Sequence, residues 1–292
     1  MPPGNEHSGA GTPAPSRETI VVHKGHGLPY SKGLMAQAIS ATGLSPGRAF
    51  ELARVIEERL DGGKIRTADL HALAEDVLRT EQDETTARRY ASWRRLDRLD
   101  RPLVVLIGGT TGVGKSTIAS MLAGRLGVNR VIATDVIRQV LRAFFTHEAM
   151  PTVHYSAFEA GGIAGYRDQA EHVGTGITAI VDRAANEAKP VVVEGVHVVP
   201  GGVHPRTRER CVLVEALVVV DDPDLHRGHF SHRPGTRPAE RYIASFEAIR
   251  RLQDHLWERA RSEGVAVIDN ENVDDTLAQL MQLVLDAVQE AQ

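Results

Sequence analysis

The chain has 292 residues, of which 42% are hydrophobic and 25% charged, and a formal net charge of −4. That length accommodates one large domain and a smaller one, and the acidic balance argues against a general nucleic-acid binder, which is usually basic. The single cysteine excludes an intrachain disulfide and a cysteine-rich metal cluster, and the sequence has no membrane-length apolar run and no signal-peptide pattern. We therefore expect a soluble, cytoplasmic protein.

The first third of the chain is expected to contain a tail and a small domain. Residues 1–18 are rich in Gly, Pro, Ser and Thr and almost lack large apolar side chains, which predicts a disordered tail. Residues 19–98 are predicted to form a mainly helical domain that begins with an extended stretch, Thr19–Val22, and a turn through Gly25 and Gly27. Its four expected helices, the third capped by Thr67, are Lys32–Thr42, Arg48–Leu60, Ala68–Thr80 and Thr85–Leu99.

Residues 101–292 have the pattern of an α/β domain, because short apolar runs alternate with helical stretches. The expected strands are Leu103–Ile107, Val131–Ala133, Val191–Val193, Leu213–Val220 and Val265–Ile268. The expected helices are Lys115–Leu126, Asp135–Phe145, Ser156–Ala188, Ala239–Ser262 and Val273–Ala291. Apolar runs of this kind are typical of strands buried on both faces, so we predict a five-stranded parallel sheet flanked by helices.

Residues Gly109–Ser116 match the phosphate-binding motif G-x-x-x-x-G-K-[ST], directly after the first expected strand of this domain and at the start of a helix. Glycines let backbone N–H groups wrap around phosphates, and a helix N-terminus adds partial positive charge. The motif predicts that Lys115 reaches the β- and γ-phosphates of ATP and that Ser116 binds Mg²⁺. The residues assigned to the nucleotide here are Gly109, Thr110, Thr111, Gly112, Val113, Gly114, Lys115, Ser116 and Thr117.

Asp135 follows the second expected strand of the sheet. Ligands of open α/β sheets bind beyond the carboxyl ends of the strands, so an aspartate there is placed to accept or orient the proton of an attacking hydroxyl group. Thr134 and Asp135 also suit the N-cap of the following helix. The sequence is compatible with both interpretations.

Glu194 ends the third expected strand, and His197 follows in the next loop. A carboxylate at the end of a buried strand is a usual second anchor for Mg²⁺, and its burial would otherwise be costly. We therefore assign Ser116 and Glu194 to the metal. His197 suits either contact with an anionic substrate or an ordinary loop position.

The segment Asp221–Arg241 carries four arginines and three histidines within 16 residues. It follows the fourth expected strand, where many small-molecule kinases with this phosphate motif carry a mobile lid, and arginines there clamp phosphates. Arg227 and Arg233 are the candidate catalytic arginines, and a solvated polar loop is the alternative. Metal binding by the histidines is disfavoured, because no carboxylate lies at a suitable spacing.

Asn270 follows the fifth expected strand. In this architecture that loop commonly passes the adenine ring, so Asn270 is a further candidate contact for ATP. A simple turn explains the residue equally well, since Asn and Asp favour turns.

These residues together resemble the 2-phosphoglycerate kinase family. The resembling blocks of the α/β domain are Ile107–Thr117, Thr134–Arg142, Glu194–Gly201, the set His226, Arg227, Phe230 and Arg233, and Asn270 with Asp274. In residues 19–98, His26–Ser31 and Ala87–Trp93 are similar to the opening and closing of an ATP-cone-like domain. The resemblance implies phosphorylation of 2-phosphoglycerate, a small anionic substrate, by ATP and Mg²⁺, giving 2,3-bisphosphoglycerate through the C3 hydroxyl.

Two features of the chain leave other functions open. Its lid is rich in Pro, His and Gly, a departure from the family that bears on acceptor selection, and residues 19–98 lack a nucleotide motif of their own. A kinase for another sugar, polyol or hydroxy acid is therefore one alternative. A nucleotide-sensing regulatory protein is the alternative from another class. Asp135 and the arginines favour catalysis, because a sensor needs neither an acceptor base nor a phosphate clamp.

Overall fold

The computed structural model describes residues 19–291 apart from residue 24, residues 97–98 and residues 232–238. The predicted tail, residues 1–18, therefore lies outside the described residues, as does Arg233 of the expected lid. Within the described residues, no helix is both long and apolar enough to cross a membrane.

The N-terminal part combines the four expected helices with a small sheet. The helices are α1 Lys32–Ser40, α2 Pro46–Glu58, α3 Thr67–Glu81 and α4 Glu84–Trp93. The strands are β1 Thr19–His23, β2 His26–Pro29 and β3 Gly63–Arg66, in the order β2-β1-β3. Buried apolar side chains of the helices, among them Ile39, Leu52, Ile56 and Leu78, form one core.

The sheet corrects three details of the sequence analysis. Gly27 is not part of the turn but pairs with Val22 across the antiparallel β1–β2 ladder. Strand β3 was not expected, because Gly63–Arg66 contains a single apolar residue and shows no alternation. Thr67 is the first residue of α3 rather than its cap, and its hydroxyl donates to the Val22 carbonyl at 3.2 Å. Its side chain ties α3 to β1 instead of capping the helix.

The α/β part confirms the predicted five-stranded parallel sheet. Its strands are β4 Leu103–Gly108, β5 Val131–Ala133, β6 Val191–Gly195, β7 Val212–Val219 and β8 Ala266–Asp269, in the order β5-β6-β4-β7-β8. The main helices are α5 Lys115–Leu126, α6 Thr134–Phe144, α7 Gly162–Glu187, α11 Phe246–Glu263 and α12 Val273–Glu290. Shorter elements are η2 Pro151–His154, α8 Pro205–Arg208, α9 Pro223–Ser231 and α10 Ala239–Ala244.

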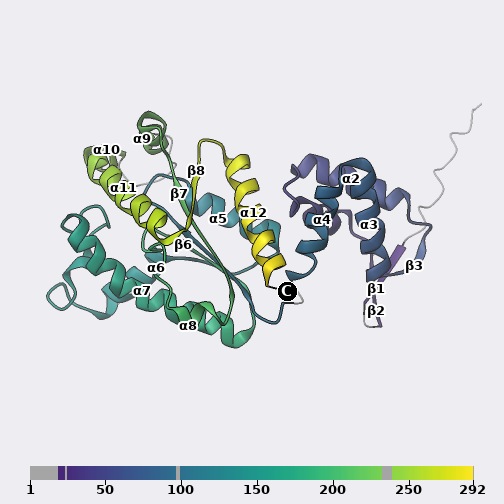
Figure 1. The fold of residues 1–292 in the computed structure, drawn as a ribbon, viewed down its shortest axis with the longest axis horizontal. Coiled ribbons are helices and arrows are strands. Elements are labelled where there is room, and N and C mark those ends of the chain that lie inside the picture. Colours follow the sequence, from purple (N-terminus) through teal and green to yellow (C-terminus); the bar gives the residue numbers. More distant parts are fainter. Residues whose placement is uncertain (1–18, 24, 97–98, 232–238, 292) are drawn as a thin grey trace, which may run out of the picture.

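Both faces of the sheet are covered by helices. Along β4, Val105 and Ile107 face α5 and α12, whereas Val104 and Leu106 face the opposite side, as the two-residue period of a strand requires. On that second side lie α7 and α11 (Figure 1). Sheet and helices therefore form three layers, and the carboxyl ends of the strands meet at one edge.

Two expected helices have different bounds in the structure. The helix predicted from Ser156 begins only at Gly162, and the helix predicted over Ala239–Ser262 is divided into α10 and α11 at Ser245. The first change leaves Ser156, Ala157 and Phe158 outside the helix, where they line a cavity beside Lys115.

The N-terminal part packs on α5 and α12 of the α/β part, beyond α12 in Figure 1. Gln37 donates to the Gly124 carbonyl at 3.0 Å, and Arg89 donates to Gln282 Oε1 at 3.0 Å. Ala41 and Trp93 pack into the core formed by α5, α12 and the sheet.

Candidate active site

The phosphate loop joins β4 to α5 and depends on glycine at positions with positive φ. Gly112 has φ 95°, and Gly114, which caps α5, has φ 84°. A Cβ atom on Gly112 would lie 2.5 Å from the ring of Phe230, and one on Gly114 would lie 2.5 Å from Asn270 Nδ2. Backbone conformation and close packing therefore both require glycine here.

Side chains from outside the motif hold three consecutive carbonyl groups of this loop. His226 Nε2 donates to the Thr111 carbonyl at 2.9 Å, and His229 Nδ1 donates to the Gly112 carbonyl at 2.8 Å. Asn270 Nδ2 donates to the Val113 carbonyl at 2.9 Å. In a trans peptide the carbonyl group and the following N–H group point in opposite directions. The N–H groups of Gly112, Val113 and Gly114 therefore point away from the three side chains. We call His226, His229 and Asn270 the loop clasp.

Two members of the clasp, His226 and Asn270, are buried. His226 is fully buried, and burial lowers its pKa to about 4, so the ring is neutral near pH 7. Asn270 is also buried, and its Oδ1 accepts from the Thr276 hydroxyl at 2.9 Å. The sequence predicts these residues to be part of the lid, an adenine contact or a turn, and their role in shaping the loop was not expected from it.

Ser116 and Glu194 meet as predicted for a metal site. The Ser116 hydroxyl donates to Glu194 Oε1 at 2.9 Å, and the strand register places Glu194 beside Ile107 at the end of β4. Glu194 is 5% exposed, and within the described part of the chain its Oε2 has no hydrogen-bond partner. A buried carboxylate oxygen without a partner is unfavourable, and a hard cation would satisfy it, so these residues fit Mg²⁺.

Lys115 starts α5 and borders a cavity of about 420 Å³, which we call the acceptor cavity. Its ammonium group donates to the Thr110 carbonyl at 3.1 Å. The cavity also receives side chains from α6 and α10, and its charged lining is Lys115, Asp135, Arg138, Arg142 and Arg241. An excess of cationic side chains makes the cavity suitable for an anionic ligand.

Asp135 lies in the first turn of α6 with its side chain half-exposed. Its Oδ1 is 3.2 Å from Arg138 Nε. Burial acts to raise the pKa of Asp135, but the positive charges of Arg138 and Lys115 outweigh this effect and hold the pKa below its usual range. Asp135 is therefore an ionised carboxylate at the mouth of the site.

The capping interpretation of Thr134 and Asp135 is wrong. The N-cap of α6 is Ala133, which makes no side-chain cap hydrogen bond. The Thr134 hydroxyl is instead 3.0 Å from His197 Nδ1. Because Asp135 makes no cap contact, its carboxylate is available for chemistry.

His197 is buried and belongs to the scaffold. Its Nε2 donates to Gln169 Oε1 at 2.8 Å and its Nδ1 accepts from Thr134. Burial lowers its pKa to about 4, so the ring is neutral. The interpretation of His197 as an anion contact is wrong, since both nitrogens are engaged and no positive charge is present at neutral pH.

Arg138 and Arg142 were not assigned from the sequence. They follow Asp135 by three and seven residues, a spacing that puts all three side chains on one face of a helix. Arg138 Nη1 donates to the carbonyls of Val153 and Tyr155, whereas Arg142 makes only a 3.4 Å contact with Gln139 Oε1 among the described hydrogen bonds. Helical spacing from Asp135 was the signal that could have identified them.

The expected lid is partly a helix in this structure. Helix α9 carries Arg227, whose guanidinium lies 4.3 Å from the centre of the Phe246 ring and 3.3 Å from Asp224. Arg227 does not line the acceptor cavity, and Arg233 lies outside the described residues.

A second opening, of about 320 Å³, also borders the phosphate loop and is the candidate nucleotide site. It is lined by Gly112, Gly114, Lys115, Ser116, Thr117, His229, Asn270, Glu271 and Val273. Lys115 and Ser116 border both openings, so groups bound in the two would meet at these residues.

Comparison with known proteins gives relatives over nearly the whole chain. A 2-phosphoglycerate kinase of Methanopyrus kandleri is 37% identical over 286 residues, covering 92% of this chain and 87% of the relative. A 2-phosphoglycerate kinase of Thermococcus kodakarensis is 36% identical, covering 87% of this chain and 92% of the relative. No family model matches the chain.

Solved structures resemble the chain only distantly. A shikimate kinase from Acinetobacter baumannii in complex with shikimate is 20% identical, with a TM-score of 0.39 over 67% of this chain and 97% of that one. The fold is therefore assigned from the strand order described above and not from this weak similarity.

Proposed function

The chain belongs to the 2-phosphoglycerate kinase family and is an ATP-dependent phosphotransferase, and we propose that its acceptor is the C3 hydroxyl of 2-phosphoglycerate. The products would be ADP and 2,3-bisphosphoglycerate. One observation carries this proposal: the cationic acceptor cavity holds an ionised Asp135 and opens beside Lys115 and Ser116.

The nucleotide side of the proposal rests on the phosphate loop. Loop N–H groups and Lys115 would bind the β- and γ-phosphates, with the loop clasp holding the loop in shape. Ser116 and Glu194 would hold Mg²⁺, which when bound supplies positive charge to the phosphates being separated.

The acceptor side rests on charge and shape. 2-Phosphoglycerate carries a carboxylate and a phosphate, and Arg138 and Arg142 offer planar donors to such groups. Asp135 would accept a hydrogen bond from the C3 hydroxyl and orient it toward the γ-phosphate. Because its pKa is low, Asp135 is a weak base, and its proton uptake would come late in the transfer.

The role of the lid stays a prediction. Arg227 would have to leave Asp224 and Phe246 in order to reach a phosphate, which requires a movement of α9 or of its side chain. A cytoplasmic location, which we expect from the sequence, goes with the proposal and also stays a prediction.

The direct test is ADP production with a panel of phosphoglycerates, sugars and hydroxy acids. We expect kcat/KM for 2-phosphoglycerate to exceed that for unphosphorylated glycerate by about 100-fold, since the phosphate makes charge-assisted hydrogen bonds. Glycerate and 3-phosphoglycerate are the matched controls for charge and for the position of the phosphate. Equal turnover of phosphorylated and unphosphorylated acceptors would contradict the assignment of the cavity.

A further inference from the structure

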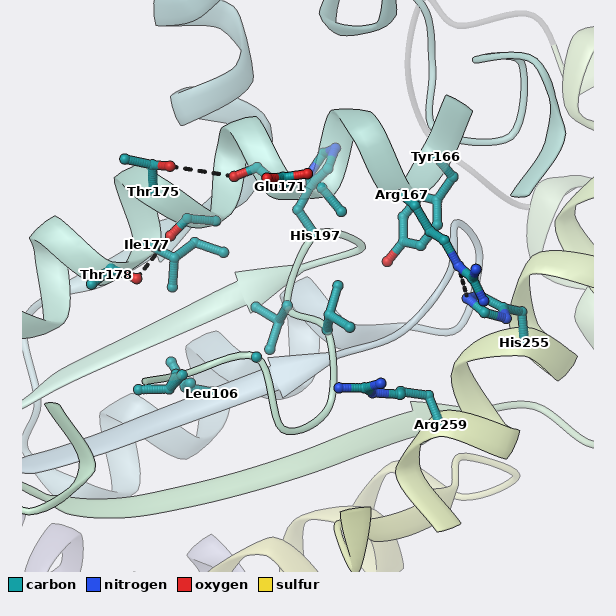
Figure 2. A pocket seen from close by; sticks show the side chains of 16 residues that line it. Leu106, Tyr166, Arg167, Glu171, Thr175, Ile177, Thr178, His197, His255 and Arg259 are labelled. Carbon is teal, nitrogen blue, oxygen red and sulfur yellow. Dashed lines mark hydrogen bonds between the residues drawn. The ribbon is translucent and has the colours of Figure 1, made fainter. Parts of the chain in front are cut away.

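A further cavity, larger than the acceptor cavity, has no part in the reaction proposed above. Its volume is about 600 Å³, within the range of small-molecule sites, and it lies between α7, α11 and the loop that follows β6 (Figure 2). We call it the rear cavity.

The lining of the rear cavity is mainly apolar, and its charged side chains are Arg167, Glu171 and Arg259. The inner wall includes Leu106, Ile177, Val198 and Val203. Arg167 of α7 meets His255 of α11, while Arg259 lies one turn further along α11 and Glu171 one turn further along α7, as Figure 2 shows. An apolar wall with the Arg167 guanidinium at its edge suits a ligand with an apolar body and an anionic group.

Arg167 is the cation best placed to bind such an anion. Its Nε donates to His255 Nε2 at 3.4 Å, so that nitrogen carries a lone pair and no proton. Burial and the charge of Arg167 lower the pKa of His255, which keeps the ring neutral. Arg259 is paired with Glu263 at 3.0 Å, but Arg167 forms no ion pair with any carboxylate that the structure describes. Arg167 is exposed, so its guanidinium is accessible to an anion that enters the rear cavity.

One short piece of backbone forms the wall between the rear cavity and the acceptor cavity. Val196 lines the acceptor cavity, while His197 and Val198 line the rear one. The Tyr166 hydroxyl, whose ring borders the rear cavity, donates to the Val196 carbonyl at 2.7 Å. His197 holds Thr134, the neighbour of Asp135. Movement of Tyr166 or His197 would therefore displace groups that face the acceptor.

From these contacts we infer that the rear cavity is an effector site for a small amphipathic anion, an apolar body that carries one carboxylate, phosphate or sulfonate group. Its occupation changes the affinity for the acceptor through Val196 and Thr134. The change in acceptor affinity rests on the proposed function, whereas the binding of the anion does not.

Gly174 provides a way to fill the cavity without disturbing the fold. It lies within α7, borders the rear cavity and has no atom within 4 Å of the position of an added Cβ. Gly174→Phe therefore places a ring in the cavity, and Gly174→Met is the milder alternative if the first variant does not fold. Gly47→Phe is the matched control, because Gly47 in α2 also has open space around an added Cβ.

The binding test uses 8-anilinonaphthalene-1-sulfonate, an amphipathic anion whose fluorescence rises in apolar surroundings. We expect saturable binding to the full chain, loss of that binding in Gly174→Phe or Gly174→Met, and no change in Gly47→Phe. Arg167→Gln should weaken binding by about tenfold. Thermal unfolding of each variant checks that it is folded.

Two outcomes of the binding test would overturn the site. One is binding that survives both Gly174 variants. The other is binding that is lost in Leu34→Ser, because Leu34 borders a separate apolar hollow of about 660 Å³ beside α1. The second outcome would place the probe in that hollow.

The effector role is tested by a separate measurement, the KM of the acceptor. At saturating probe, the KM of the acceptor that the substrate panel identifies should change at least threefold in the native chain and stay constant in Gly174→Phe. A constant KM in the native chain would refute the effector role. If 2-phosphoglycerate is not turned over but another acceptor is, the proposed function fails while this test proceeds with that acceptor.

Discussion

The phosphate loop and the acceptor cavity lie beside each other at the same edge of the sheet, but they are built in different ways. The loop is eight consecutive residues whose glycines allow its conformation. The acceptor cavity takes its charged residues from three helices, α5, α6 and α10. A contiguous motif can therefore specify the nucleotide site, whereas acceptor specificity depends on how separate helices pack. Mutations in the two regions should consequently have different kinetic signatures.

The largest effect is expected at the residue that the two regions share. Lys115→Ala should lower kcat by about 1,000-fold, because it removes the cation placed at both openings. The fold should persist, as judged by thermal unfolding. Lys189→Ala, at an exposed lysine after α7, is the matched control. Activity within about threefold of the native chain, about 0.65 kcal/mol, would show that the phosphate site is assigned wrongly.

Asp135→Asn tests the chemistry of the acceptor side. It should lower kcat by about 100-fold with little change in the KM for ATP, because an amide cannot take up the hydroxyl proton. Melting temperature should change little, since Asp135 caps no helix and its own side chain in the ion pair with Arg138 is exposed. Asp254→Asn, at an exposed position of α11, is the control. A stability loss with normal kcat would instead assign Asp135 a structural role.

Arg142→Gln should act on the acceptor alone. We expect the KM for 2-phosphoglycerate to rise about tenfold while the KM for ATP stays constant, because the change removes one charge-assisted contact. Arg251→Gln, at an exposed position of α11, is the control. Arg138 is a less clean probe, since it also holds the Val153 and Tyr155 carbonyls. Equal changes in both KM values would mean that Arg142 does not distinguish the two openings.

The loop clasp should produce the opposite pattern. His226→Leu removes the donor to Thr111 and should raise the KM for ATP about fivefold, with a smaller effect on the acceptor. His226→Gln can keep a donor at a similar reach and should recover most of the loss. If the glutamine variant is as impaired as the leucine variant, the hydrogen bond is not what the loop requires.

The smallest expected effect concerns how the free energy of unfolding depends on pH. The pKa values of His226 and His197 are lowered to about 4 in the folded chain from 6.5, so the unfolded chain binds more protons between these values. The free energy of unfolding should therefore rise from pH 4 to pH 6.5 and then level off. Urea unfolding at several pH values measures it, and His226→Gln should give a shallower slope. An identical slope in the variant would remove His226 as a contributor.

Much of the fold could be predicted from local pattern. Strand Val131–Ala133 and helix Lys115–Leu126 have the expected bounds. Apolar runs and the glycine-rich start of α5 are strong signals over a few residues. Strand β3 was missed because its pairing with β1, not its own residues, makes it a strand. The secondary structure of this short polar segment was therefore decided by the strand with which it pairs.

The sequence by itself determined the phosphate loop, the Ser116–Glu194 pair and the sheet that carries them, since each depends on residue type at a fixed spacing or at a strand end. Only the tertiary structure decided which histidines bind the loop and which one is buried in the scaffold. His226 and His197 are both neutral and buried, yet one contacts the Thr111 carbonyl and the other contacts Thr134 and Gln169. The position of a ring relative to distant backbone is set by helix packing, and no spacing along the chain records it.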